Sequence, residues 1–205
     1  MQHNPDIHHR RSIRLKGYDY AGEGWYFITI CTRNYRHLFG KIENGAMMAN
    51  DAGRMAAETL LWLPKQYEYV HLAEWIVMPN HLHAIIVIDD AGGDLGMGGG
   101  DCRVGSCRGG SRTAPTIHTT QIAPTTITKR KPLGRLIGAY KTVSTKRINE
   151  MRNMMGAPVW QRNFYEHIIR NHESYLKIAE YIQTNPLKWA EDRYYGMYGA
   201  QGQGL

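Results

Sequence analysis

Apolar segments with strand and helix periodicity follow one another along this chain in the order β-α-β-β-α-β-α. Residues 25–32 are β-branched and aromatic, which predicts a strand buried on both faces. Two further strands are expected at 69–78 and 81–89, and a tight turn at Pro79 and Asn80 joins them. The other elements are expected to be a helix from Asn50 or Asp51 to about Pro64, a helix with an apolar stripe over 136–148, a strand at 159–169, and a helix from Glu173 to about Asn185.

A short hairpin is expected before the first helix, because Asn44 and Gly45 form a typical two-residue turn between the apolar runs 38–42 and 46–49. With the hairpin set aside, the first six elements match the ferredoxin-like split βαβ pattern, an antiparallel sheet with helices packed on one face. The predicted fold class is therefore α+β, with one further helix at its C-terminal end. Many unrelated functions use this fold, so function has to be argued from individual residues.

Composition divides the chain into a basic N-terminal arm at 1–20, a folded domain at 21–190 and a flexible tail at 191–205. Within the domain, residues 91–131 are rich in Gly, Thr and Pro, and nine of the chain's 22 glycines lie between Gly92 and Gly110. Such a composition cannot bury a core and predicts a flexible insert.

Net charge and cysteine content narrow the function classes. The chain carries 25 Lys and Arg against 18 Asp and Glu, a net charge of +7, which favours polyanionic partners such as nucleic acid. Three cysteines, Cys31, Cys102 and Cys107, are too few for a disulfide framework, and no second pair with zinc-site spacing accompanies the last two. No apolar run is long enough for a membrane span or a secretory signal, so a cytoplasmic location without membrane association is expected.

His81, Leu82 and His83 lie in a predicted strand, so the two imidazoles point to one face and Leu82 to the other. Their Cα atoms are then roughly 6–7 Å apart, and the rings can converge on one divalent ion. A polar strand end with satisfied hydrogen bonds is the alternative, and the strand alone leaves the two interpretations equal.

Tyr181 falls outside the apolar stripe of the last predicted helix, and Asn185 follows one turn later on the same face. Pro186 ends or kinks the helix directly afterwards, which leaves the Asn185 side chain free to turn inward. A phenol beside a carboxamide suits a metal-assisted nucleophile, although a half-buried structural tyrosine has the same pattern.

Three motifs, together with their order along the chain, resemble the REP-associated tyrosine transposases, a branch of the single-tyrosine HUH transposases. They are MPNHLHAII at 78–86, VWQRNFYEHIIR at 159–170 and EYIQTNP at 180–186. The segments RRSIRLKGY at 10–18 and YFITICT at 26–32 are also similar to the family. The resemblance covers about residues 9–90 and 132–190. The insert and the tail lie outside it.

The resemblance implies that Tyr181 is the nucleophile and that His81, His83 and Asn185 hold a divalent metal, Mg²⁺ or Mn²⁺. Attack on a phosphodiester would give a 5′-phosphotyrosine and a free 3′-OH, and a second 3′-OH could reverse the step. A phenol with a pKa of about 10 needs a cation nearby to ionise. For Trp160, Gln161, Glu166 and His167 the resemblance implies no individual roles, and a structural role for their strand is expected.

The implied substrate is single-stranded DNA beside an imperfect hairpin, with no small-molecule substrate. The candidate phosphate contacts are Arg10, Arg11, Arg14 and Lys16 in the arm, and Arg135, Lys141, Lys146 and Arg147 on the helix that follows residue 132.

Two rival classes fit less well. Metal-dependent hydrolases with a His-x-His motif need further metal ligands on a much larger barrel. An RNA-binding domain on this fold should carry an aromatic Gly-Phe signature, which is absent. A non-catalytic or domesticated single-stranded nucleic-acid-binding protein remains the alternative.

Overall fold

The computed structural model describes residues 15, 17–89 and 130–197, all of which belong to one compact unit. The candidate DNA contacts Arg10, Arg11, Arg14 and Lys16, most of the predicted insert and the end of the predicted tail lie outside the described residues.

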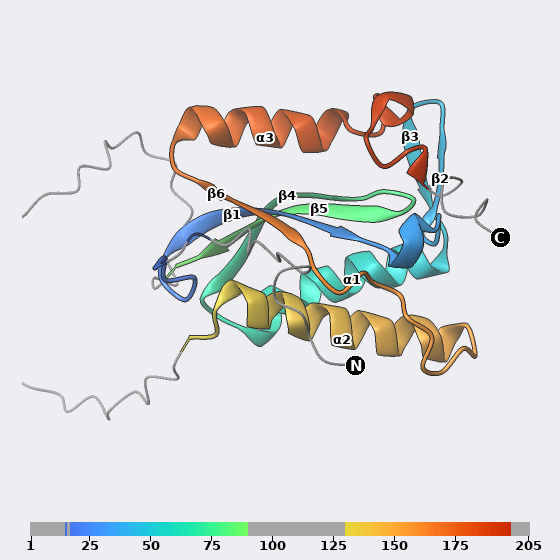
Figure 1. Ribbon diagram of the computed structural model, residues 1–205, viewed down its shortest axis with the longest axis horizontal. Coiled ribbons are helices and arrows are strands. Elements are labelled where there is room, and N and C mark those ends of the chain that lie inside the picture. The colour runs from blue at the N-terminus through green and yellow to red at the C-terminus, as the bar shows by residue number, and fades with distance from the viewer. Residues whose placement is uncertain (1–14, 16, 90–129, 198–205) are drawn as a thin grey trace, which may run out of the picture. The chain divides into compact units, whose positions relative to one another are not determined.

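A four-stranded antiparallel sheet is the centre of the described part (Figure 1). Its strands, in the spatial order β4-β5-β1-β6, are β4 (Val70–Val77), β5 (His81–Ile88), β1 (Gly24–Cys31) and β6 (Tyr165–Ile169). Each neighbouring pair is antiparallel. The helices are α1 (Asp51–Gln66), α2 (Leu133–Met151) and α3 (His172–Thr184), and a separate hairpin pairs β2 (Gly40–Glu43) with β3 (Ala46–Ala49).

Along the chain the main elements run β1-α1-β4-β5-α2-β6, followed by α3. This chain order and the spatial order of the strands are those of the split βαβ pattern, so the predicted α+β, ferredoxin-like fold class is confirmed. In Figure 1, α1 and α2 cover one face of the sheet and α3 lies over the other.

The alternation of side chains along β1 and β5 builds the two faces. Ile28 and Leu82 belong to the larger core, beneath α1 and α2. Phe27 and Ile85 point to the opposite face and pack with Ile182 of α3 in a smaller cluster. The histidines at the start of β5 share this second face.

Side-chain caps begin two of the helices, α1 at the predicted Asn50 and α3 at Asn171, which the sequence did not single out. The Asn50 carboxamide accepts a hydrogen bond from the Gly53 N–H at 3.0 Å, and Asn171 accepts from Ser174 at 2.8 Å. The first helix passes the predicted stop at Pro64 by two residues, because proline removes only its own N–H and the Tyr67 N–H still reaches the Leu63 carbonyl.

The strand predicted at 159–169 is shorter than expected, because β6 covers only Tyr165–Ile169. Trp160 forms an isolated bridge with Thr32. Between the two, the Lys141 ammonium donates hydrogen bonds to the carbonyls of Gln161 and Asn163, at 2.8 and 2.9 Å. A side chain from α2 therefore satisfies backbone groups that a continuous strand would have paired.

Candidate metal centre and nucleophile

The two histidines converge on the α3 side of the sheet. His81 and His83 are 0% and 1% exposed, and their ring centroids are 4.5 Å apart. In the register of β1 and β5, His81 lies opposite Cys31, and His83 lies opposite Thr29. The two imidazoles therefore lie on one face of the strand, as the period of two along a strand predicts.

Hydrogen bonds to the Nδ1 atoms fix both rings. His81 Nδ1 lies 2.8 Å from Asn80 Oδ1, and the Asn80 amide nitrogen donates to the Tyr194 carbonyl at 2.9 Å. The carboxamide oxygen can only accept, so Nδ1 of His81 carries the proton and Nε2 keeps its lone pair. His83 Nδ1 lies 2.8 Å from the Thr29 hydroxyl. Metal-binding histidines are oriented in the same way.

The Nε2 atom of His81 is buried and has no hydrogen-bond partner among the described residues. Unpaired buried polar atoms are rare and costly. Burial lowers the pKa of His81 to about 3, and the nearby charge of Arg193 adds to this effect. Burial, followed by the neighbouring His81, holds the pKa of His83 well below its usual value. Both imidazoles are therefore neutral at pH 7 and able to bind a cation.

These lowered pKa values predict a stability that depends on pH in the metal-free protein. Below pH ~6.5 the unfolded chain protonates its histidines, whereas His81 in the folded chain stays neutral to about pH 3. The unfolded state then binds more protons, so the free energy of unfolding falls as the pH is lowered. From His81 alone we expect a loss of about 2 kcal/mol between pH 7 and pH 5.

Urea unfolding in EDTA at a series of pH values measures this loss. His81→Gln should reduce the slope between pH 7 and pH 5. An unchanged slope in that variant would show that His81 is accessible to protons in the folded state.

Tyr181, on α3, stands directly beside the histidines. Its hydroxyl lies 3.2 Å from His83 Nε2 and 3.5 Å from Asp192 Oδ2, and the side chain is 40% exposed. Burial, followed by the negative charge of Asp192, raises the pKa of Tyr181 to about 12. The phenol is therefore protonated at neutral pH, and ionising it requires a nearby positive charge.

Asn185 ends α3 and is 2% exposed. Its amide nitrogen donates a hydrogen bond to Asp192 Oδ2 at 3.0 Å, while its Oδ1 atom is buried without a hydrogen-bond partner in the described part. The predicted third ligand thus lies at the site and contacts a residue that the sequence did not single out.

Asp192 completes the group. One ligand atom each of His81, His83 and Asp192 lie within 4.8 Å of one another. A 3-10 turn, η2 (Trp189–Glu191), follows the helix break at Pro186 and returns the chain to the histidines. Two imidazoles and one carboxylate form a donor set for a divalent transition metal.

Other residues of the same segment lie against the centre. The rings of Tyr194 and Trp189 have their centroids 4.7 and 6.0 Å from that of His81. Tyr194 is buried and Arg193 is exposed. The segment predicted as a tail therefore contributes directly to this region, and no periodicity or motif in the sequence marks it.

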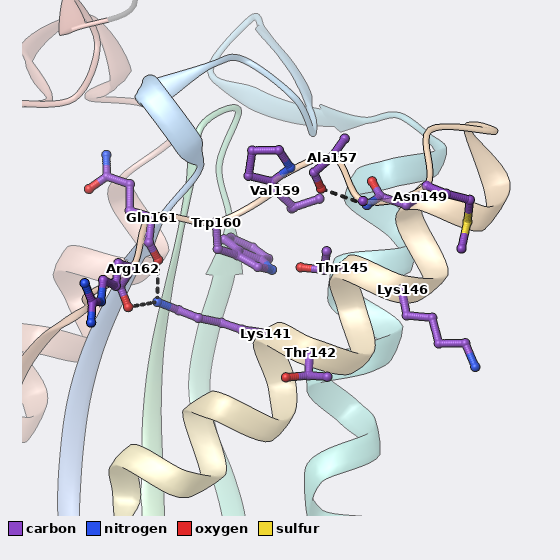
Figure 2. A pocket seen from close by; sticks show the side chains of 13 residues that line it. Lys141, Thr142, Thr145, Lys146, Asn149, Ala157, Val159, Trp160, Gln161 and Arg162 are labelled. Carbon is purple, nitrogen blue, oxygen red and sulfur yellow. Dashed lines mark hydrogen bonds between the residues drawn. The ribbon is translucent and has the colours of Figure 1, made fainter.

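The basic side chains of α2 lie across the sheet from Tyr181, because α2 and α3 cover opposite faces (Figure 1). Figure 2 shows Lys141 pointing to the carbonyls of Gln161 and Arg162, beside an open hollow of about 510 Å³ between α2 and residues 155–162. Burial lowers the pKa of Lys141 to about 8. Its ammonium contacts the protein's own backbone.

The other three α2 candidates differ in their surroundings. Arg147 is 3.7 Å from Glu58 and donates to the Thr59 hydroxyl at 3.2 Å. Lys146 is well exposed and lies 3.8 Å from Glu150, a weak surface pair. Arg135 is exposed.

Residues of the 159–170 motif have two kinds of surroundings. Trp160 is buried, and its indole N–H donates to the Ser144 hydroxyl at 2.8 Å. The Gln161 N–H donates to the Cys31 carbonyl at 2.9 Å. These two residues hold the segment to the end of β1, which agrees with a structural role. His167 is exposed on β6.

Among the described helices, none has the length and apolarity of a membrane span. No family model matches the chain. A solved structure of a REP-associated tyrosine transposase bound to a REP hairpin is similar over 89% of this chain and 76% of that chain, with a TM-score of 0.49 and 16% identity. An uncharacterized protein of Haemophilus influenzae is 39% identical over 194 residues, which cover 95% of this chain and 97% of the relative. The chain belongs to the same family as this Haemophilus influenzae protein.

Proposed function

We propose that this chain is a metal-dependent endonuclease and strand transferase that cleaves single-stranded DNA through a covalent bond to Tyr181. One observation carries the proposal: the Tyr181 hydroxyl lies 3.2 Å from His83 Nε2, within a group that also holds His81 and Asp192. The nucleophile therefore lies beside a cation site and is accessible to DNA from solvent. The three motifs that resemble the REP-associated tyrosine transposases support the same reaction.

His81, His83 and Asp192 would hold the metal, and the Nε2 of His81, which has no hydrogen-bond partner in the described part of the chain, fits this assignment. Asn185 would either add its Oδ1 atom as a ligand or keep the Asp192 carboxylate in place through its amide nitrogen. Imidazole ligands suit Mn²⁺ better than Mg²⁺, so we expect higher activity with Mn²⁺. When bound, the cation would polarise the phosphate and stabilise the phenolate.

In the proposed reaction the Tyr181 oxygen attacks the phosphorus, and the bond from phosphorus to the 3′ oxygen breaks. The phenol loses its proton, for which Asp192 Oδ2 is an acceptor 3.5 Å away. The departing 3′ oxygen gains a proton from water. The products are a 5′-phosphotyrosine and a 3′-OH, and attack by another 3′-OH would transfer the strand.

Phosphate contacts would come from exposed cations. Arg193 is exposed, and its charge acts on both His81 and Tyr181, so it is the best placed of the described cations to meet the phosphate. Arg135 and Lys146 remain candidates for contacts further along a hairpin. The arm residues Arg10, Arg11, Arg14 and Lys16 remain candidates from the sequence.

A cleavage assay tests the proposal. The full chain is incubated with a labelled oligonucleotide that carries a hairpin and single-stranded flanks, in Mn²⁺, Mg²⁺ or EDTA. We expect cleavage within a flank that requires the metal, and none in a fully paired duplex. Tight binding without cleavage in any metal would instead support the non-catalytic alternative.

A further inference from the structure

The edge of the sheet beside Tyr181 carries exposed aromatic side chains that the proposed reaction does not use. Strand β6 is the outermost strand on this side, next to β1. Its register places Tyr165 opposite Thr29 and His167 opposite Phe27. Directly opposite residues share a face, so Tyr165 and His167 lie on the face that carries His83 and α3.

Phe27 links this edge to the proposed nucleophile. Its ring centroid is 5.3 Å from that of His83, in a stacked arrangement, and 6.2 Å from that of Tyr181, edge to face. The Tyr165 ring lies 6.3 Å from the same Phe27 ring, also edge to face. Tyr165 and Tyr181 are therefore both neighbours of one buried ring. We name Tyr165, Phe27 and His167 the β6 ledge.

The β6 ledge is partly exposed to solvent. Tyr165 is 46% exposed and Tyr181 is 40% exposed, whereas Phe27 between them is 8% exposed. Along α3, Ile182 packs with Ile85 and Phe27. Tyr165 is thus a half-exposed aromatic ring in edge-to-face contact with a buried phenylalanine that also contacts Tyr181.

We infer that the β6 ledge binds a base of the single-stranded DNA next to the scissile phosphate, by stacking on Tyr165 and contact with His167. This inference rests on one part of the proposed function, namely that a DNA strand binds beside Tyr181. A net charge of +7 suits a polyanion, and aromatic platforms hold successive bases of single strands without needing a particular sequence. A duplex keeps its bases stacked inside and cannot use such a platform.

Binding is measured without cleavage, in EDTA and in the Tyr181→Phe background, with a fluorescein-labelled 20-nucleotide oligothymidine as the probe. Tyr165→Ala should raise its Kd about tenfold, within the range for loss of one stacked base. Tyr165→Phe should stay within about twofold, because the ring face is kept. Leu176→Ala on α3, which removes a similarly exposed apolar side chain, is the matched control and should leave the Kd unchanged. Affinity for a 20-base-pair duplex should not respond to Tyr165→Ala.

A second measurement needs no variant at the ledge, so it holds even if Tyr165→Ala fails to fold. Oligothymidine with a single 5-iododeoxyuridine is crosslinked to the Tyr181→Phe protein by light, and trypsin then releases residues 163–170 as one peptide. We expect the label on that peptide. A label elsewhere, or an unchanged Kd in Tyr165→Ala, would overturn the inference. If the ledge binds DNA but the wild-type chain never cleaves it, the proposed function fails and the inference stands.

Discussion

Tyr181→Phe is expected to abolish the covalent protein–DNA adduct and to lower the cleavage rate by at least about a thousandfold, as loss of a covalent nucleophile does. Phenylalanine keeps the ring beside Phe27 but has no oxygen to attack phosphorus. The removed hydroxyl belongs to a side chain that is 40% exposed, so the free energy of unfolding should change by less than about 1 kcal/mol. Adduct formation is scored on denaturing gels with labelled hairpin DNA and Mn²⁺.

Tyr175→Phe is the matched control, because this residue lies on the same helix but packs against Trp25 and His172 rather than against His81 or His83. It should form the adduct at the wild-type rate. Persistence of the adduct in Tyr181→Phe would mean that a different side chain attacks, and Tyr165 would become the first candidate.

Replacing either histidine of the pair is expected to remove cleavage while sparing DNA binding. His81→Gln and His83→Gln should each lower the cleavage rate by at least about a hundredfold, because the cation that stabilises the charge on phosphate is lost. Affinity for DNA should hold, since phosphate contacts elsewhere supply most of it. Mn²⁺ should raise the Tm of the wild-type protein by binding its folded state, and it should not raise the Tm of the double variant.

His172→Gln, an exposed histidine at the start of α3, serves as the control and should keep both cleavage and the Mn²⁺ response. The metal assignment would be wrong if Mn²⁺ left the wild-type Tm unchanged and the variants lost several kcal/mol of stability in EDTA. That pattern would describe a pair with a structural role in the core.

The sequence predicts the sheet and the histidine pair well because both follow from local periodicity. A period of two along 81–89 places His81 and His83 on one side of the strand, and the order of apolar segments gives the split βαβ connection. Tyr181 and Asn185 follow from helical spacing in the same way. These features depend only on neighbours in the sequence.

Features that depend on tertiary packing were not predictable from the same patterns. Asp192 reaches the histidines only after the chain breaks at Pro186 and turns through η2, and no spacing rule carries across such a break. The late start of the strand predicted at 159–169 depends on Lys141, a side chain from another element. The sequence predicts this lysine as a DNA contact; in the fold its ammonium donates to the backbone carbonyls of Gln161 and Asn163.

Mass spectrometry of the purified adduct tests the central claim most directly. After nuclease and trypsin digestion, Tyr181 lies in the peptide of residues 178–188, of which it is the only tyrosine, while Tyr165 and Tyr175 fall in two other peptides, 163–170 and 171–177. The account predicts a nucleotide joined through its 5′-phosphate to Tyr181 in peptide 178–188. A nucleotide on either of the other peptides, or cleaved DNA with no modified peptide at all, would contradict it.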